Sequence, residues 1–408
     1  MNLEQVKQKL KTYGQEHLLT YYDTLSAKEQ EALLAQIAET DFSAVTRVKN
    51  GATDKQIGKI TPITPMTLAE ITANKEDFHR AGLEIIREGK AGAVLLAGGM
   101  GTRLGSDNPK GMYDIGLTKP VYIFQRIIEN LLDVVNEAKT WIHLFIMTSD
   151  KNHEKTTSFF AEKNYFGYDK EHIHFFRQDM APASDYQGNI YLEEKGKLAT
   201  SPNGNGGWYS SMKNAGFIEL LHKEGIKYLN VFAVDNVLQR IADPCFIGAV
   251  AGRKCQVGAK VVRKNHPDEK VGVMCLEDNH PSIIEYYELT DELRDTVLEN
   301  GEPAYNFGVI LNYLFETDCL EKITSNELPL HIVEKKIPCL DKDGNAFKPE
   351  EPNGYKFETL ILDLIKLSDS CLPFEVEREK EFAPIKNKTG IDSVESARAL
   401  LEKNGIPL

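Results

Sequence analysis

Between residues 91 and 234 the sequence alternates short apolar runs with longer segments in which apolar residues recur at helical spacing. A parallel strand covered on both faces is apolar along its whole length, and its connection to the next parallel strand is usually a helix. This alternation predicts an α/β fold with a mixed, mainly parallel sheet and helices on both faces. The apolar runs read AVLLA, IHLFIM, HIHFF and YLNVFAV, and the helical segments extend from Val121 to about Asn136, onward from His153, and from Trp208 to Glu224.

The runs that follow Asp243 are spaced differently. QVGAKVV, VGVMCL and SIIEYYEL come in close succession, with no long helix between them. Strands joined by short connections pair antiparallel, so we expect an antiparallel extension of the same sheet.

The two ends of the chain have other patterns. Near the N-terminus, Leu3, Val6 and Leu10 recur at helical spacing, and Ser26 with Glu29 forms a capping box before a second apolar stripe. Near the C-terminus, the turn signals DKDGN and EEPNG precede one helix near residues 359–367. We therefore predict three parts: an N-terminal helical segment (1–88), a central sheet domain (89–319) and a small C-terminal α+β domain (320–408).

Composition narrows the class of protein. The 48 Lys and Arg against 61 Asp and Glu give a net charge of −13, which argues against a surface that coats nucleic acid. No apolar run approaches the ~18–20 residues of a membrane span, and the N-terminus has no signal-peptide core. The six cysteines are widely spaced, without a C-x-x-C pair. We expect reduced thiols and a cytoplasmic protein that contacts neither nucleic acid nor membrane.

A glycine-rich loop, Leu95 to Gly105, follows directly after the first strand of the predicted sheet. Its glycines free backbone amides to approach phosphate oxygens, and Arg103 adds a guanidinium that binds them bidentately. The loop is neither a P-loop nor a dinucleotide fingerprint, because its spacing is G-x-G-x-x-x-G, and this disfavours a dinucleotide-dependent dehydrogenase. The alternative is a tight strand-to-helix turn with a surface Arg.

Other segments extend this pattern. LAGGMGTRLG together with PKGMYD, which contains Lys110, resembles the signature of sugar-nucleotide pyrophosphorylases. Further on, NGNGG, VFAVDN, GAKVVRKNHPDEKVGV, IIEYYE, YNFGVI, PNGYKFE and EFAPIKN follow in an order and spacing similar to eukaryotic-type UDP-N-acetylhexosamine pyrophosphorylases and related UDP-sugar pyrophosphorylases. The resemblance covers about Ala91 to Asn387. It implies a Rossmann-like, GT-A-like nucleotidyltransferase fold, with residues 89–319 as the catalytic domain.

The resemblance also implies a reaction and a set of site residues. The implied reaction is uridylyl transfer from UTP to a sugar 1-phosphate, with N-acetylglucosamine 1-phosphate as the expected substrate and Mg²⁺ as cofactor. Asp235, at the carboxyl end of an apolar strand, is the expected metal ligand, although a helix-capping role is its alternative. The implied catalytic residues are Arg103, Lys110 and Lys386; the nucleotide-binding residues are Leu96, Ala97, Gly98, Gly99, Gln178, Gly204 and Asn205; the sugar-binding residues are Gly272, Glu285 and Asn306.

Two departures from the hexosamine pattern leave the sugar open. Phe307 and Val309 follow Asn306 where those enzymes typically have NAGNI, and Leu360 and Leu362 are aliphatic where aromatics are usual. Glucose 1-phosphate or a broader sugar range is therefore the alternative. A catalytically inactive nucleotide-binding regulatory protein is the alternative of a different class, and it would be expected to lack one of the cations or the metal carboxylate. The sequence leaves the oligomeric state and the direction of flux open.

Overall fold

The chain forms two compact units in the computed structural model, which describes residues 1–49, 58–326 and 328–408. The larger unit contains Ile57–Gln178, Trp208–Glu327 and Leu362–Leu408, and the smaller unit contains Met1–Gln56, Asp179–Gly207 and Leu328–Ile361. Each unit thus combines segments that are far apart in the sequence. No helix within the described ranges is both long enough and apolar enough to cross a membrane.

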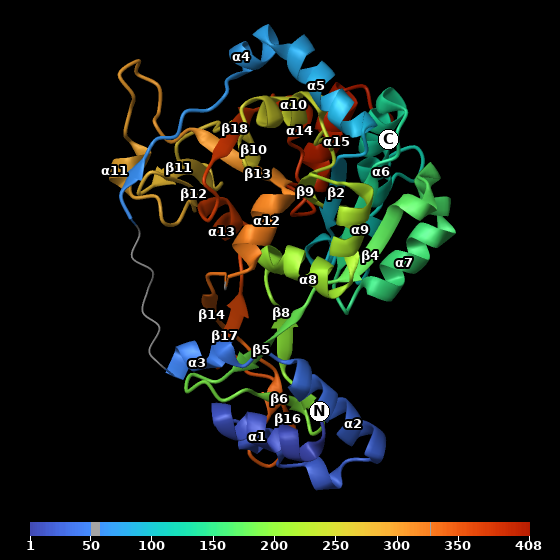
Figure 1. Ribbon diagram of the computed structural model, residues 1–408, viewed down its shortest axis with the longest axis vertical. Coiled ribbons are helices and arrows are strands. Elements are labelled where there is room, and N and C mark those ends of the chain that lie inside the picture. The colour runs from blue at the N-terminus through green and yellow to red at the C-terminus, as the bar shows by residue number, and fades with distance from the viewer. Residues whose placement is uncertain (50–57, 327) are drawn as a thin grey trace. The chain divides into compact units, whose positions relative to one another are not determined.

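The larger unit is built on a mixed sheet, for which ten strands are found among the described residues (Figure 1). The neighbours β9, β2, β3 and β4 are all parallel, whereas β13 pairs antiparallel with β9, β10 and β11. The predicted α/β fold and its antiparallel extension are both confirmed. The strands are β1 (Ile60–Thr61), β2 (Ala91–Leu96), β3 (His143–Thr148), β4 (Ile173–Arg177), β9 (Tyr228–Ala233), β10 (Val257–Arg263), β11 (Val273–Glu277), β12 (His280–Ile284), β13 (Phe307–Glu316) and β18 (Cys371–Glu375).

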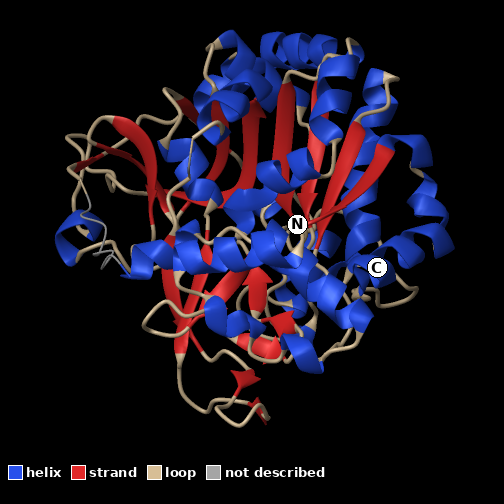
Figure 2. Cartoon of the chain, turned by 60° about the horizontal axis from the view of Figure 1, so that its bottom comes forward, coloured by secondary structure: helices blue, strands red, loops and turns tan. Residues whose placement is uncertain are grey.

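Helices lie along the strands of this sheet (Figure 2). One predicted helix, Trp208 to Glu224, is wrong as a single element: it breaks at Gly216, whose φ of 81° is left-handed and ends the helical backbone. The helices are α4 (Leu68–Ala73), α5 (Lys75–Arg87), α6 (Ile123–Ala138), α7 (His153–Glu162), α8 (Trp208–Asn214), α9 (Phe217–Glu224), α10 (Pro244–Gly252), α11 (Asp291–Arg294), α12 (Thr317–Thr324), α13 (Ile361–Lys366), α14 (Arg378–Glu381) and α15 (Val394–Lys403), with short 3-10 turns at Thr102–Leu104, Lys110–Met112, Asn164–Gly167 and Lys170–His172.

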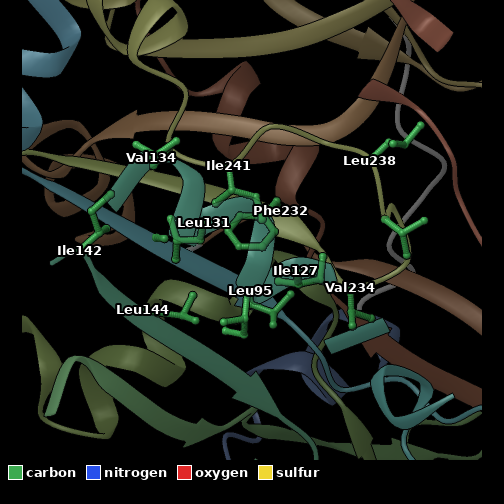
Figure 3. Close-up of a cluster of buried hydrophobic side chains, with 14 of the residues drawn as sticks. Leu95, Ile127, Leu131, Val134, Ile142, Leu144, Phe232, Val234, Leu238 and Ile241 are labelled. Carbon is green, nitrogen blue, oxygen red and sulfur yellow. The ribbon is translucent and has the colours of Figure 1, made fainter. Parts of the chain in front are cut away.

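The core of the larger unit lies between α6 and the parallel strands. Figure 3 shows the apolar side chains of Ile127 and Leu131 on α6 beside Leu95 of β2 and Phe232 of β9. All four are buried, and fully burying a side chain of this size contributes about 1.5–3 kcal/mol. This packing fixes β2 and β9 next to each other, so the segments that follow their carboxyl ends leave the sheet side by side.

The smaller unit combines N-terminal helices with a four-stranded sheet. Val6 of α1 and Leu33 of α2 are fully buried in one apolar cluster with Ile190, Leu192 and Phe357. The predicted capping box of Ser26 and Glu29 is present at the start of α2. The elements are α1 (Leu3–Tyr13), α2 (Ala27–Glu39), α3 (Ser43–Lys49), the sheet β14 (His331–Lys335), β17 (Gly354–Glu358), β5 (Met180–Ser184) and β8 (Thr200–Pro202), the hairpins β6 (Leu192–Glu194) with β7 (Lys197–Leu198) and β15 (Cys339–Leu340) with β16 (Ala346–Phe347), and the 3-10 turns Glu16–Leu19, Tyr22–Thr24 and Asn205–Gly207.

The two units cut across the three predicted segments. Strand β17, from the predicted C-terminal part, pairs with β5 of the predicted central part, and both share the smaller unit with the N-terminal helices. Conversely, β18 of the predicted C-terminal part pairs with β10 in the larger sheet. The difference arises because strand pairing joins segments more than 110 residues apart, and a division into consecutive stretches of sequence cannot include such pairs.

Candidate active site

The glycine-rich loop leaves the carboxyl end of β2 and folds back on itself. The Gly101 N–H donates to the Asn108 carbonyl (2.8 Å) and the Lys110 N–H donates to the Gly99 carbonyl (3.1 Å). These two bonds set the segment around Lys110 alongside the glycines, as expected from the closeness of the two motifs in the sequence. The loop and Lys110 therefore form one structural feature.

Two polar residues that were not predicted, Ser149 and Asn152, bind the backbone carbonyls of this loop. The Ser149 hydroxyl donates to the Gly98 carbonyl (2.9 Å), and the Asn152 amide donates to the Ala97 carbonyl (2.9 Å) and to the Gly99 carbonyl (3.4 Å). Asn152 is fully buried. Both residues follow the carboxyl end of β3, the neighbour of β2. Their place after a predicted strand is the sequence feature that could have identified them, because ligand sites of open α/β sheets lie at the carboxyl ends of the strands.

These contacts decide where the amides of the loop point. In a trans peptide the C=O and the following N–H point in opposite directions. With the carbonyls of Ala97 and Gly98 held by Asn152 and Ser149, the N–H groups of Gly98 and Gly99 face the other way. Within the described part of the chain, neither N–H donates a hydrogen bond to the protein. Oriented donors of this kind form an anion-binding site.

Four charged residues, Arg103, Lys110, Asp235 and Lys386, gather beside the loop; we refer to them as the charged cluster. Lys110 Nζ lies 3.6 Å from Asp235 Oδ2, and both side chains are largely buried, at 17% and 22% exposure. Burial lowers the pKa of the Lys110 ammonium; Asp235 opposes that shift, while the positive charges of Arg103 and Lys386 add to it. The structure thus brings together all three predicted catalytic cations and the predicted metal ligand.

The C-terminal segment folds back to reach this cluster, as a role for Lys386 requires. The Ile385 N–H donates to the Asp235 carbonyl (2.9 Å), and Pro384 forms an antiparallel bridge with Asn236. Lys386 Nζ itself donates to Asp392 Oδ2 (2.9 Å). The Lys386 ammonium is therefore paired with Asp392 while lying close enough to affect the Lys110 charge.

The predicted nucleotide-binding residues fall in both units. In the larger unit, Leu96 ends β2, and Ala97 and Gly98 begin the loop. The Gln178 side chain lies next to Gly98, because a Cβ placed on Gly98 would be 3.3 Å from Gln178 Oε1. Gln178 is mostly buried, and its N–H donates to the Thr148 carbonyl (2.8 Å).

In the smaller unit, Gly204 has a left-handed φ of 86°, and Asn205 Oδ1 accepts a hydrogen bond from the Ile361 N–H (3.0 Å). The predicted contact of Gly204 and Asn205 with a uracil base stays a prediction.

The predicted sugar-binding residues lie in the antiparallel part of the larger sheet. The pairing of Val273 with both Ile284 and Gly308 puts Gly272, Glu285 and Val309 on one face of neighbouring strands. A Cβ on Gly272 would lie 3.5 Å from Glu285 Oε2, so the missing side chain leaves room for that carboxylate. Burial raises the pKa of the Glu285 carboxyl, and Glu288 adds to the shift.

Asn306 and Phe307 begin β13. The Asn306 carbonyl accepts a hydrogen bond from the Lys264 N–H (2.9 Å). The Phe307 ring is 9% exposed and lies under the Arg263 guanidinium, 5.0 Å from ring centre to Cζ. Arg263 is held in turn by Glu375, its Nε lying 2.8 Å from Oε1. Phe307 is thus fixed against Arg263.

The donor set restricts what kind of metal the site could take. No group of three or more His, Cys, Asp or Glu side chains suited to a metal ion occurs among the residues that the structure describes. Asp235 is a single carboxylate at the strand end, beside the loop in which the N–H groups of Gly98 and Gly99 donate to no described protein group. Mg²⁺ is commonly held by one or two carboxylates together with ligand phosphates and water. Asp235 fits an ion shared with a bound nucleotide.

Parallel strands that end in a glycine-rich loop and an acidic residue place this site where open α/β sheets bind nucleotides. The family description of UTP–glucose-1-phosphate uridylyltransferase matches residues 41–406. The chain belongs to this family of UDP-sugar pyrophosphorylases, and the predicted resemblance is confirmed.

Individual relatives cover nearly the whole chain. The UDP-N-acetylglucosamine pyrophosphorylase of Saccharomyces cerevisiae is 36% identical over 421 residues, covering 96% of this chain and 88% of that protein. The UDP-N-acetylhexosamine pyrophosphorylase-like protein 1 of Mus musculus is 34% identical, covering 95% and 81%. The crystal structure of the uridine diphosphate N-acetylglucosamine pyrophosphorylase from Trypanosoma brucei, in complex with an inhibitor, superposes with a TM-score of 0.82 at 27% identity, covering 97% and 83%.

Proposed function

We propose that this protein transfers uridylyl from UTP to N-acetylglucosamine 1-phosphate, giving UDP-N-acetylglucosamine and pyrophosphate. The observation that carries the proposal is the Lys110 and Asp235 pair, held 3.6 Å apart beside a loop with two N–H groups, those of Gly98 and Gly99, that donate to no described protein group. The yeast and trypanosome relatives are both named as UDP-N-acetylglucosamine pyrophosphorylases, which supports the choice of N-acetylglucosamine.

The chemistry needs charge neutralisation more than a protein nucleophile. An oxygen of the sugar phosphate forms a bond to the α-phosphorus of UTP, and the bond from that phosphorus to the bridging oxygen breaks, so that pyrophosphate leaves with the electron pair. The attacking phosphate is already ionised at neutral pH. The amides of Gly98 and Gly99, with Lys110, Arg103 and Lys386, would hold the two anions together and stabilise the charge that grows on the leaving group.

We also propose Mg²⁺ as the cofactor, with Asp235 as its protein ligand. When bound with the nucleotide, the ion would neutralise phosphate charge that the three cations of the cluster do not cover. Asp235 also pairs with Lys110, so the Lys110 ammonium lies beside the proposed position of the ion. The cytoplasmic location stays a prediction.

The identity of the sugar depends on the face that carries Gly272, Glu285 and Val309. Bulk at Phe307 could close the space beside the second carbon of the sugar, but its ring is fixed against Arg263. Phe307 lies two residues before Val309 on β13, so it is on the same face as Glu285, and the choice of N-acetylglucosamine rests on the named relatives. Glucose 1-phosphate stays the alternative substrate.

A panel of sugar 1-phosphates with UTP and Mg²⁺, followed by pyrophosphate release, tests the proposal. We expect the highest kcat/KM with N-acetylglucosamine 1-phosphate and partial activity with glucose 1-phosphate, because losing favourable contacts of one small group costs only about 1–3 kcal/mol. A markedly higher kcat/KM for glucose 1-phosphate would reverse the choice of sugar. Absence of pyrophosphate release with every sugar would support the inactive regulatory protein instead.

The base should be discriminated more strongly than the sugar. Gln178, mostly buried beside Gly98, would pair with the polar edge of uracil, and a site of this kind rejects analogues that leave buried groups unpaired. We expect kcat/KM for UTP to exceed that for CTP, ATP and GTP by on the order of 10³-fold. Gln178→Ala should narrow this preference, whereas Gln187→Ala, an exposed amide of the smaller unit, should not. Comparable turnover with ATP would contradict the assignment.

A further inference from the structure

Asn236 joins the strand end that carries Asp235 to the segment that carries Lys386. Its side chain is 1% exposed. Asn236 Nδ2 donates to the Glu381 carbonyl (2.7 Å), and Asn236 Oδ1 accepts from the Ala383 N–H (2.9 Å). Both ends of the amide therefore bind one short stretch, residues 381–383, which lies just before Lys386.

The same stretch is anchored at its start by a buried ion pair. The Glu381 carboxylate contacts Lys260 Nζ, which is fully buried in β10 and also lies 3.0 Å from Asp243 Oδ2. After residue 383, backbone bonds continue the attachment, because the Ile385 N–H donates to the Asp235 carbonyl. Lys386 is only three residues from Ala383, the last residue that Asn236 contacts, so the backbone at Lys386 has little freedom to move relative to Asn236.

We propose that Asn236 is a positioning residue for uridylyl transfer, which acts by fixing Lys386 relative to Asp235 and Lys110. The inference rests on the proposed function, because it assigns Lys386 a role at the phosphates. Asn236 has no role in charge neutralisation of its own, since its amide is neutral and its hydrogen bonds are made within the protein. Loss of the amide leaves the charges of the cluster in place; it releases residues 381–383 and also the Leu238 N–H, which donates to Asn236 Oδ1 (3.3 Å).

Asn130 provides a matched control. It is a buried amide of α6, and Asn130 Nδ2 donates to the carbonyls of Val237 (3.2 Å) and Gln239 (3.1 Å). Its third hydrogen bond, accepted by Oδ1 from Arg126 Nη2 (2.7 Å), stays within α6. Asn130 thus holds the loop after Asp235 through bonds that do not involve residues 381–386. If Asn236 only kept that loop folded, Asn130→Ala would reproduce the effect of changing Asn236.

The test is a double-mutant cycle of Asn236→Ser with Lys386→Ala, measured as kcat and KM for UTP. We expect Asn236→Ser alone to lower kcat by on the order of 10- to 100-fold, as for a misplacement of about 1 Å, with a smaller change in KM. In the Lys386→Ala background the same substitution should lower kcat less than about twofold, because the group it positions is gone. Asn130→Ala should lower kcat by the same factor in both backgrounds.

Two outcomes would overturn the inference, and they differ in what they say of the activity. If Lys386→Ala is impaired and Asn236→Ser lowers kcat equally with and without Lys386, the positioning role is wrong while the proposed reaction stands. If Lys386→Ala retains full turnover, Lys386 is not at the phosphates, and Asn236 cannot act through it.

Hydrogen exchange supplies a readout that does not depend on activity. Peptides covering residues 378–392 should exchange faster in Asn236→Ser than in the wild type, and at the wild-type rate in Asn130→Ala. Unchanged exchange in Asn236→Ser would also overturn the inference. Should Asn236→Ser fail to fold, Asn236→Gln keeps a neutral amide but displaces both of its hydrogen-bonding ends by one methylene group, and the same results are expected from it.

Discussion

Replacing Asp235 by Asn is expected to reduce turnover by on the order of 10³-fold or more, the largest effect of any single substitution that we anticipate. The change keeps the shape of the side chain and removes its negative charge. Lys110 then loses the carboxylate 3.6 Å from its Nζ, and the proposed Mg²⁺ would lose an anionic oxygen, for which a neutral amide is a poorer replacement. The measurement is pyrophosphate release over a titration of Mg²⁺ at saturating UTP and sugar phosphate.

Asp369→Asn is the matched control for this experiment. Asp369 also pairs with a lysine, its Oδ2 lying 3.2 Å from Lys322 Nζ, but the pair is exposed and lies outside the charged cluster. Exposed pairs of this type contribute little to stability, so this variant should keep wild-type turnover and Mg²⁺ dependence. An Asp235→Asn protein with ordinary Mg²⁺ dependence would assign the ion to other residues.

The second large effect is expected from Lys110→Ala, with a loss of turnover of roughly 10²- to 10³-fold, or about 2–4 kcal/mol in the transition state. Charge on the departing pyrophosphate grows as its bond breaks, so the cation contributes more in the transition state than to UTP binding. We therefore expect kcat to fall at least as much as UTP affinity does. Steady-state kinetics and calorimetric titration with UTP separate the two quantities.

Lys155→Ala tests whether loss of structural support for the loop is enough to lower turnover as Lys110→Ala does. Lys155 Nζ donates to the carbonyl of Asp107 (3.2 Å) and to Asn108 Oδ1 (3.0 Å), so it supports the same connection from its exposed side. Turnover should change less than about twofold in this variant. If Lys110→Ala folds normally and turns over like the wild type, Lys110 is structural.

Much of the fold could be predicted from local pattern because its signals are local. The apolar run AVLLA became β2, the Ser26 and Glu29 box capped α2, and the glycine-rich loop lay where a strand of a parallel sheet ends. The break at Gly216 was missed because the apolar residues on either side of it continue a helical stripe. The division into units was missed because it depends on the pairing of β5 with β17.

The candidate site could be predicted only in part, for a related reason. Arg103, Lys110 and Asp235 each stand beside a strand end or a motif that marks them. Ser149 and Asn152 are distinguished in the sequence only by their place after a strand. Their contacts with the loop carbonyls depend on β3 lying next to β2, which the sequence does not specify locally. The Lys260, Asp243 and Glu381 contacts join residues up to 121 positions apart, and nothing in their local sequence distinguishes them from surface charges.

The composite origin of the smaller unit has a consequence for the chain during its synthesis. Helices α1 and α2 are made first, but their apolar residues pack against Ile190 and Leu192, and then against Phe357 of β17. At 5–20 residues per second, the ribosome reaches β17 between roughly 15 and 60 s after completing α2. During that interval the N-terminal helices present an uncovered apolar surface, of the kind that chaperones bind. A chain released before residue 354 would keep that surface exposed.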